Sequence, residues 1–324
     1  MVDSEIIGVL ASILLQASPL IIAVCGETIT ERVGVVNLSL DGTMLLSAMT
    51  GFVAAFKTGS LALGFLAAAG IGALFALIVA FASIRLRQSQ VAVGFVLTLL
   101  GDDLSAFLGQ NYTRLPGPVV QKLSVPILED IPVLGPLLFQ QNMVFYFAVV
   151  LVVVTYWWLF RTNPGLNLRA AGERPDAAFA RGVNVEWTRY FYTLIGGALV
   201  GIAGATYSLN IKIGWSEGAT RGFGWIALAI VIFGGWSPIR GAFGAILFGA
   251  TKALATVLQR TFPEVSVVAF NALPWLLMIT VLLLVSGDFT ERIVALAPRR
   301  MRKTLTRMLR VAPPRALGTE LVER

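Results

Sequence analysis

Three adjacent stretches set the architecture: the apolar QNMVFYFAVVLVVVTYWWLF (141–160), the polar RTNPGLNLRAAGERPDAAFARGVNVEWTR (161–189) and the apolar YFYTLIGGALVGIAGATYSLNI (190–211). Each apolar stretch has about the length of a helix that crosses the hydrocarbon core of a bilayer. The polar stretch between them is called the island below. We predict two transmembrane helices joined by a large polar loop on one membrane surface.

The composition extends this prediction to the whole chain. Of 324 residues, 56% are hydrophobic and 13% are charged, and the mean hydropathy is +0.80. These values are typical of a polytopic membrane protein, in which helices satisfy their own backbone hydrogen bonds. No polar segment is long enough to bury a soluble core. We therefore expect an all-α transmembrane bundle at residues 1–290, including the island, followed by a basic cytoplasmic tail at 291–324.

Apolar runs separated by charge, glycine and proline clusters predict about nine spans. The seventh is too short to cross a bilayer unaided, so it is either a half-helix or a helix that continues through Gly234 and Gly235. The first run lacks a preceding basic region and a cleavage site, and we expect it to be retained. The predicted spans are residues 5–25, 38–57, 60–84, 91–109, 141–160, 190–211, 223–236, 240–258 and 265–286.

The distribution of Lys and Arg predicts the orientation. When nine spans are threaded, one side of the membrane receives 18 of these residues and the other side receives 7. The positive-inside rule then places the N-terminus outside and the C-terminus and the island in the cytoplasm. The net charge of +7 fits this rule and contact with anionic membrane lipid, rather than nucleic-acid binding. Residues 291–310 are either an amphipathic helix along the membrane or a solvated basic tail.

Several classes of chemistry are excluded by what the sequence lacks. It contains no His, which rules out His-dependent triads and HExxH metal sites, and it has no GxxxxGK[ST] motif for binding nucleotide phosphates. Cys25 is the only cysteine, so no intrachain disulfide can form. We expect a non-catalytic subunit with no cofactor or metal of its own.

Polar residues at membrane depth are candidates for a translocation path, because they are costly to bury. Asn37 and Asp41 are four residues apart and would share a helical face; alternatively, Asn37 caps a helix and Asp41 complements its dipole. Asp102 and Asp103 lie late in the fourth span and point about 100° apart, so at most one faces a narrow path, unless both lie at the outer interface.

A polar and aromatic turn on the expected outer side contains two further candidates, Asn210 and Trp215. Aromatic residues in this position are commonly interfacial anchors, and the functional alternative is a mouth that receives a solute. Glycines recur at intervals of three to five residues in the sixth and eighth spans, which favours close helix packing rather than a ligand site.

The island contains the signals of a short helix at residues 175–182. Pro175 suits the first helical position, Asp176 the positive end of the helix dipole, and Gly182 the position just after the helix end. A helix of this length needs support from the bundle or a partner. Phe179 and the neighbouring alanines would form a knob for a groove on a soluble protein, and the alternative is an ordinary loop.

Two stretches, GERPDAAFARGVNVEWTRYFYTLIGGALVGIAGATYSL (172–209) and GFGWIALAIVIFGGWSPIRGAFGAILFGATKAL (222–254), resemble the permease family of bacterial ABC importers for ribose-type sugars, branched-chain amino acids and nucleosides. Two more, ERVGVVNLSLDGTML (31–45) and QSQVAVGFVLTLL (88–100), are most similar to the nucleoside and simple-sugar branch of this family. The resemblance covers roughly residues 20–290.

The resemblance implies a mechanism and partners. Transport would proceed by alternating access in a bacterial inner membrane, with ATP and Mg bound by a separate ATPase subunit, a second and non-identical permease, and an extracytoplasmic solute-binding protein. Members of the branch often carry Glu where this chain has Asp41. The segment that docks on the ATPase would contain Gly172, Glu173, Pro175, Ala177, Ala178, Phe179 and Gly182.

The expected solute is a nucleoside, and a simple sugar is the alternative. A competing class is a secondary transporter in which Asp41, Asp102 or Asp103 couples solute movement to an ion gradient.

Overall fold

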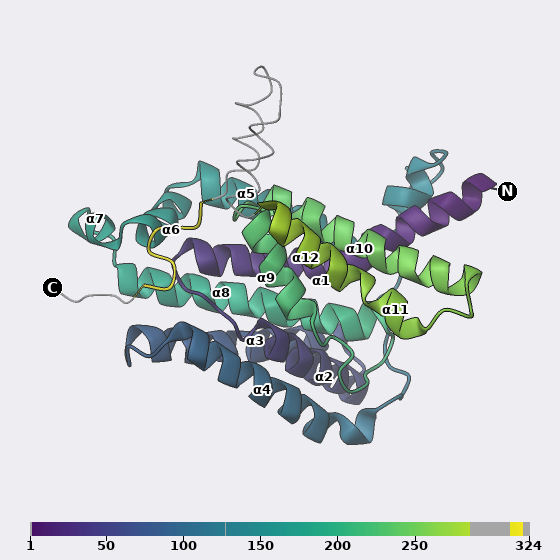
Figure 1. Ribbon diagram of the computed structural model, residues 1–324, viewed down its shortest axis with the longest axis horizontal. Coiled ribbons are helices and arrows are strands. Elements are labelled where there is room, and N and C mark those ends of the chain that lie inside the picture. Colours follow the sequence, from purple (N-terminus) through teal and green to yellow (C-terminus); the bar gives the residue numbers. More distant parts are fainter. Residues whose placement is uncertain (1, 127, 286–311, 320–324) are drawn as a thin grey trace, which may run out of the picture.

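The computed structural model describes residues 2–126, 128–285 and 312–319 (Figure 1), and these residues form helices without a β-strand. The all-α prediction is confirmed. The longer helices are α1 (Val2–Arg32), α2 (Leu40–Thr58), α3 (Leu61–Ile84), α4 (Gln90–Gly109), α5 (Met143–Arg161), α6 (Asn163–Glu173), α8 (Val185–Thr206), α9 (Phe223–Phe233), α10 (Pro238–Thr261) and α12 (Leu273–Val285). Short helices are η1 (Gln110–Tyr112), η2 (Gly135–Phe139), α7 (Pro175–Ala180), η3 (Tyr207–Ile211) and α11 (Val267–Asn271).

Within the described residues, six helical segments are long and apolar enough to cross a membrane. They are Ile6–Arg32, Leu61–Ile84, Gln90–Tyr112, Met143–Arg161, Val185–Ile211 and Pro238–Thr261. The other three predicted spans correspond to the less apolar α2, to the short α9, and to the pair α11 and α12, which is interrupted at Ala272.

Close helix packing places α1 and α8 at the centre of the bundle, with α2, α3 and α4 on one side and α10 and α12 on the other (Figure 1). A Cβ atom on Gly196 of α8 would collide with the backbone of Gly26 in α1, and one on Gly201 would collide with the backbone of Ala68 in α3. The glycines of the sixth span therefore serve helix packing, as the sequence predicts.

The first helix is longer than predicted. It continues past Cys25 to Arg32 and carries Glu27 and Glu31, both buried, into the bundle interior. The prediction ended this span at residue 25 because hydropathy falls where charged residues begin. The surrounding helices bury these carboxylates, and the last charged turns of α1 remain helical.

A non-helical segment, residues 33–39, runs from the end of α1 into the bundle along α4. The Val36 amide donates to Gln90 Oε1 at 2.7 Å, and Thr98 Oγ1 donates to the Leu38 carbonyl at 2.8 Å. These side chains satisfy backbone groups that lipid would leave unpaired. As a result α2 begins deep in the bundle, where Gly42 crosses Gly101 of α4.

The seventh predicted span is a half-helix. α9 contains 11 residues, and most of them are buried. It ends at Phe233, followed by Gly235 and Trp236 in the left-handed region, with φ of +69° and +51°, before Pro238 begins α10. The glycine break therefore terminates the helix.

The island contains two helices rather than one. The predicted short helix is α7, which begins at Pro175, and Gly182 follows its end with φ of +82°. α6 was not predicted, because Asn163, Gly165 and other weak helix formers occupy it. Its start is stabilised by the Thr162 hydroxyl, which accepts a hydrogen bond from the Gly165 amide at 3.1 Å.

Residues 312–319 lie beside α6 and the start of α8, at the end of the molecule opposite the N-terminus (Figure 1). Residues 291–310, for which an amphipathic helix and a solvated basic tail were the two alternatives, fall outside the described residues.

Candidate coupling and translocation site

The N-terminal end of α9 is capped by Asp41 from the first turn of α2. Asp41 is buried, and its Oδ1 accepts hydrogen bonds from the amides of Gly222 at 2.8 Å and Gly224 at 3.0 Å. A Cβ atom on Gly224 would collide with the Asp41 backbone, so a glycine is needed for this approach. The carboxylate satisfies free amides at the positive end of the α9 dipole. This contact spans more than 180 residues of sequence.

Next to this cap, Asp102 of α4 forms an ion pair with Arg221. Both carboxylate oxygens lie 2.9 Å from Arg221 Nη2, and the Asp102 carboxylate raises the pKa of the guanidinium above its usual value. Asp103 is exposed and points elsewhere, as the angle between adjacent helical residues predicts. Gly42 and Gly101 bring α2 and α4 together here, and both Asp41 and Asp102 contact residues at the start of α9.

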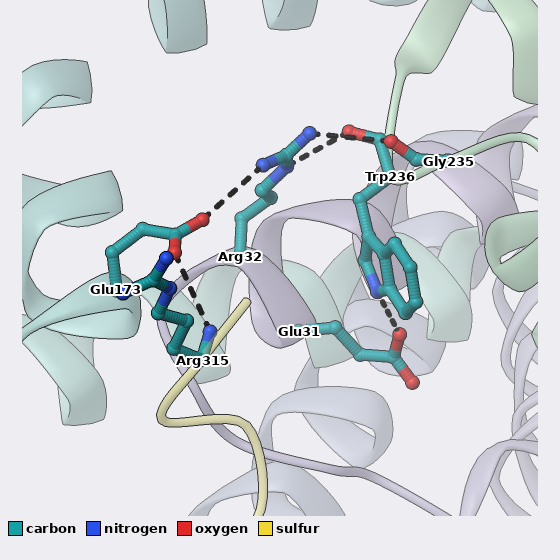
Figure 2. Close-up of polar contacts among 6 residues, drawn as sticks. All are labelled: Glu31, Arg32, Glu173, Gly235, Trp236 and Arg315. Carbon is teal, nitrogen blue, oxygen red and sulfur yellow. Dashed lines mark hydrogen bonds and ion pairs between the residues drawn. The ribbon is translucent and has the colours of Figure 1, made fainter. Parts of the chain in front are cut away.

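The C-terminal end of α9 is held by α1. Arg32 donates from Nε to the Trp236 carbonyl at 2.9 Å and from Nη2 to the Gly235 carbonyl at 3.2 Å, and the Trp236 indole donates to the Glu31 carboxylate (Figure 2). These two carbonyls belong to the turn that follows α9, whose Gly235 and Trp236 amides donate to the Ile232 and Val231 carbonyls of the helix. A cation beside this turn lies near the negative end of the helix dipole. The half-helix thus has an anion at one end and a cation at the other.

The same arginine connects α9 to the island. Glu173, the last residue of α6, places Oε1 4.0 Å from Arg32 Nη1, on the side of the guanidinium away from Trp236 (Figure 2). Gly172 packs so closely on the end of α1 that a Cβ atom would collide with the Arg32 carbonyl. Two of the predicted coupling residues therefore contact the residue that holds α9.

The rest of the predicted coupling segment lies in or next to α7. Ala178 is 2% exposed and packs toward the bundle, whereas Phe179 is 71% exposed. Ala177 and Gly182 are exposed, and Pro175 is half-buried. The prediction that Phe179 and the neighbouring alanines form one exposed knob was therefore partly wrong, because Ala178 faces the bundle. Phe179 is the exposed aromatic side chain of α7.

The remaining path candidates do not lie together. Asn37 precedes α2 rather than sharing its face with Asp41, and its Oδ1 accepts from the Ser39 amide at 3.1 Å. Asn37 is not the helix cap either, since the N-cap residue is Ser39. Asn210 is buried and accepts from Asn142 Nδ2. Each of these side chains accepts a hydrogen bond through its oxygen, whereas the buried Nδ2 atoms of Asn37 and Asn210 have no partner within the part of the chain that the structure describes.

Trp215 is 2% exposed and packs on Gly109, so it is not an exposed interfacial anchor. It lines a cavity of about 690 Å³ formed by residues 113–116 and 212–217. The predicted turn therefore does contain a hollow, and Trp215 forms part of its wall.

Sequence reasoning missed Arg32, Arg221 and Trp236. Arg32 was counted as a charge that sets orientation, Arg221 as such a charge and as part of the polar and aromatic turn, and Trp236 as the end of an apolar run. A signal was present in the glycines that flank them, since Gly222 and Gly235 mark the two ends of α9.

Comparison with known proteins supplies the family. A profile described as "Branched-chain amino acid transport system / permease component" matches residues 9–285. The chain is 39% identical to the putative glucose ABC transporter permease protein TsgC13 of Haloferax volcanii over 76% of each chain. It is 36% identical to the nucleoside ABC transporter permease protein NupC of Lactococcus lactis, covering 77% of this chain and 82% of the relative.

The chain is also 35% identical to the guanosine ABC transporter permease protein NupQ of Bacillus subtilis, covering 83% of this chain and 89% of the relative. No solved structure matches it. The profile match and the relatives agree with the helical bundle and its apolar spans. The chain belongs to the branched-chain amino acid transport system permease family, and it is a multi-pass permease of ABC transporters in the inner (plasma) membrane.

Proposed function

We propose that this chain is the translocating subunit of an ATP-driven importer and that it carries a nucleoside by alternating access. ATP and Mg would be bound by separate ATPase subunits. The support is the similarity to permeases named for guanosine and nucleosides, together with a chain of contacts from the island to the half-helix α9. Permeases of this kind change between outward- and inward-facing states when the ATPases close.

The proposed orientation places the N-terminus outside and the island, residues 312–319 and the C-terminus in the cytoplasm, with nine segments that cross or enter the membrane. The excess of Lys and Arg on the island side supports this arrangement. So does the position of α6, α7 and residues 312–319 at the end of the molecule opposite the N-terminus (Figure 1).

The single observation that carries the mechanism is the route from Glu173 through Arg32 to Gly235 and Trp236. A partner that moves α7 also moves α6, since one residue separates them. Arg32 then passes this movement to the C-terminal end of α9, which is about 16 Å long. The proposed coupling residues are Gly172, Glu173, Pro175, Ala177, Ala178, Phe179 and Gly182.

The proposed translocation path passes the N-terminal end of α9. Asp41 and Asp102 contact the residues that begin this half-helix, and half-helix ends of this kind commonly face solute sites in transporters. Asn37, Asn210 and Trp215 would contact the solute only before or after this point, and the exposed Asp103, which points elsewhere, would not contact it. The cavity near Trp215 is a candidate place for its entry.

The complex would contain a second, non-identical permease, an extracytoplasmic solute-binding protein and membrane lipid. One bundle provides one wall of a path, so a second is needed to enclose it. Mass measurement of the purified complex distinguishes two different permeases from two copies of this chain.

Glucose is the second candidate solute, because a relative of comparable similarity is named a putative glucose permease. The complete complex, reconstituted in proteoliposomes with ATP inside, decides between the two. We expect uptake of radiolabelled guanosine that requires ATP and the binding protein. Uptake of glucose alone would identify the sugar transporter, and uptake by this chain alone under an ion gradient would contradict the proposed class.

Docking of the ATPase is tested by Phe179→Ala. An exposed aromatic anchor that contributes about 2 kcal/mol to an interface corresponds to roughly 30-fold weaker binding. Binding of the ATPase to the detergent-solubilised permease measures this directly. Phe179→Tyr, which retains the ring, is the matched control, and unchanged affinity in the Ala variant would show that α7 does not dock through Phe179.

A further inference from the structure

Residues 312–319, called the strap below, join three elements of the expected cytoplasmic end through their backbone. The Ala316 amide donates to the Gly172 carbonyl of α6 at 2.9 Å, and the Gly318 amide donates to the Gly34 carbonyl at 3.2 Å. Arg189 of α8 donates from Nη1 to the Thr319 carbonyl at 3.2 Å. The strap thus connects the island to the end of α1 and to the base of α8.

The strap packs into the helical bundle instead of lying on its surface. Pro314 and Ala316 are buried, and Arg189 is 1% exposed beneath them. The Arg315 amide also points at Glu173 Oε2, at 3.4 Å (Figure 2). The carboxylate that faces Arg32 with one oxygen therefore faces the strap with the other.

Without the strap, α6 would contact Arg32 through a single 4.0 Å ion pair between partly exposed groups and through the packing of Gly172. An ion pair of this kind is weak and leaves the carboxylate free to turn away. The backbone bonds of the strap fix Gly172 and Glu173 relative to α1 and α8. A displacement of α7 is then delivered to Arg32 instead of being absorbed within the island.

We propose that the strap is a positioning element for coupling: it holds α6 against α1 and α8 so that movement of the ATPase reaches α9. This inference rests on the proposed function of the island. Gly172, Gly318 and Arg189 are its positioning residues, and none of them is assigned a contact with the solute.

Gly318 provides a matched pair of variants. Its φ is +72°, in the region that Gly adopts freely and Asn tolerates, whereas a β-branched side chain is strained there. A Cβ atom would only touch Val36 Cγ2 at 3.4 Å, so the side chain itself fits. Gly318→Val therefore disfavours the strap conformation, and Gly318→Asn preserves it without altering the membrane spans.

In the reconstituted complex we expect Gly318→Val to lower guanosine uptake per ATP hydrolysed by about tenfold, and Gly318→Asn to remain within about twofold of the parent chain. ATPase binding and hydrolysis would persist in both variants. Unchanged uptake per ATP in Gly318→Val would overturn the proposal. A loss of uptake, hydrolysis and complex yield in equal proportion would also overturn it, by showing a merely structural role.

Hydrogen exchange separates this inference from the proposed function. Backbone amides of α6 would exchange faster in Gly318→Val, and in a chain that ends after residue 311, than in the parent chain or in a chain that ends after Thr319. If the parent complex failed to couple ATP hydrolysis to uptake, the proposed function would be refuted. The exchange rates of the α6 amides would still show whether the strap holds this helix in place. Equal exchange rates of the α6 amides in all four chains would refute the proposed role of the strap.

Discussion

The two ends of α9 lie beside opposite charges in different surroundings. At the N-terminal end, Asp41 is buried and accepts two short hydrogen bonds from backbone amides. At the C-terminal end, Arg32 is shared between two carbonyls and Glu173, whose side chain is 43% exposed and 4.0 Å away. One end is fixed by buried bonds alone, and the other also depends on a long, partly exposed ion pair to the island that can rearrange at low cost. The half-helix is therefore anchored near the expected path and adjustable near the island.

The largest effect is expected from Asp41→Ala. This change leaves the buried amides of Gly222 and Gly224 without their acceptor, at a cost of about 3 kcal/mol, which corresponds to roughly 100-fold slower uptake if the cost falls on the transport cycle. Guanosine uptake in proteoliposomes, normalised to complex yield, measures it. Asp103→Ala removes an exposed carboxylate next to Asp102 and is the control. Normal uptake by Asp41→Ala would mean that the fixed end is dispensable.

Arg32→Met tests the adjustable end. Methionine retains much of the aliphatic stem but loses the hydrogen bonds to the carbonyls of Gly235 and Trp236 and the pair with Glu173. We expect about tenfold slower uptake with ATP hydrolysis retained, because the ATPase still docks on α7. Arg32→Lys keeps the charge but not the two-pronged geometry, and an intermediate rate is expected. A parallel loss of hydrolysis and uptake would place Arg32 in assembly instead.

Glu173→Gln separates the contribution of the ion pair to uptake from that of the hydrogen bonds that Arg32 donates to the two carbonyls. The pair is partly exposed, so the expected decrease in uptake is only about threefold. In the Arg32→Met background the same change is expected to have no further effect, since both variants interrupt one route. The four rates form a double-mutant cycle, and additive losses would show that Glu173 acts independently of Arg32.

The smallest effect is expected at the exposed ion pair beside the fixed end. Asp102→Asn removes the charge that faces Arg221, whose side chain is 56% exposed, and we expect about twofold slower uptake at low ionic strength. The difference from the parent chain would disappear at about 1 M salt, where such pairs are screened. Asp103→Asn is the matched control. A large, salt-independent loss would show that Asp102 contributes to the path itself.

Local patterns predicted most of the helices and part of the candidate site. The short helix of the island was found because Pro175 and Gly182 mark its ends through backbone geometry that adjacent residues impose. The divergence of Asp102 and Asp103 followed from helix geometry alone. The family resemblance directed attention to Gly172 and Glu173, which do lie against Arg32.

Other features had no local signal. α6 was missed because Thr162 and the neighbouring helices stabilise a stretch of weak helix formers. Asn37 was expected on the face of α2, but the helix begins only at Leu40, because Gln90 and Thr98 of α4 satisfy the backbone that precedes it. Trp215 was expected either at an interface or in a mouth for the solute, and the small Gly109 provides the space that buries it.

The sequence by itself determined that this protein is a helical membrane protein, because the match between apolar side chains and the bilayer depends on composition and length, and its resemblance to a known family indicated a permease. Only the tertiary structure decided which groups hold α9. Asp41 meets Gly222 and Gly224, and Arg32 meets Gly235 and Trp236, because glycines let particular helices cross closely at those points. These partners lie about 180 to 200 residues apart, and helical periodicity carries no information about which distant backbone group a buried charge will reach.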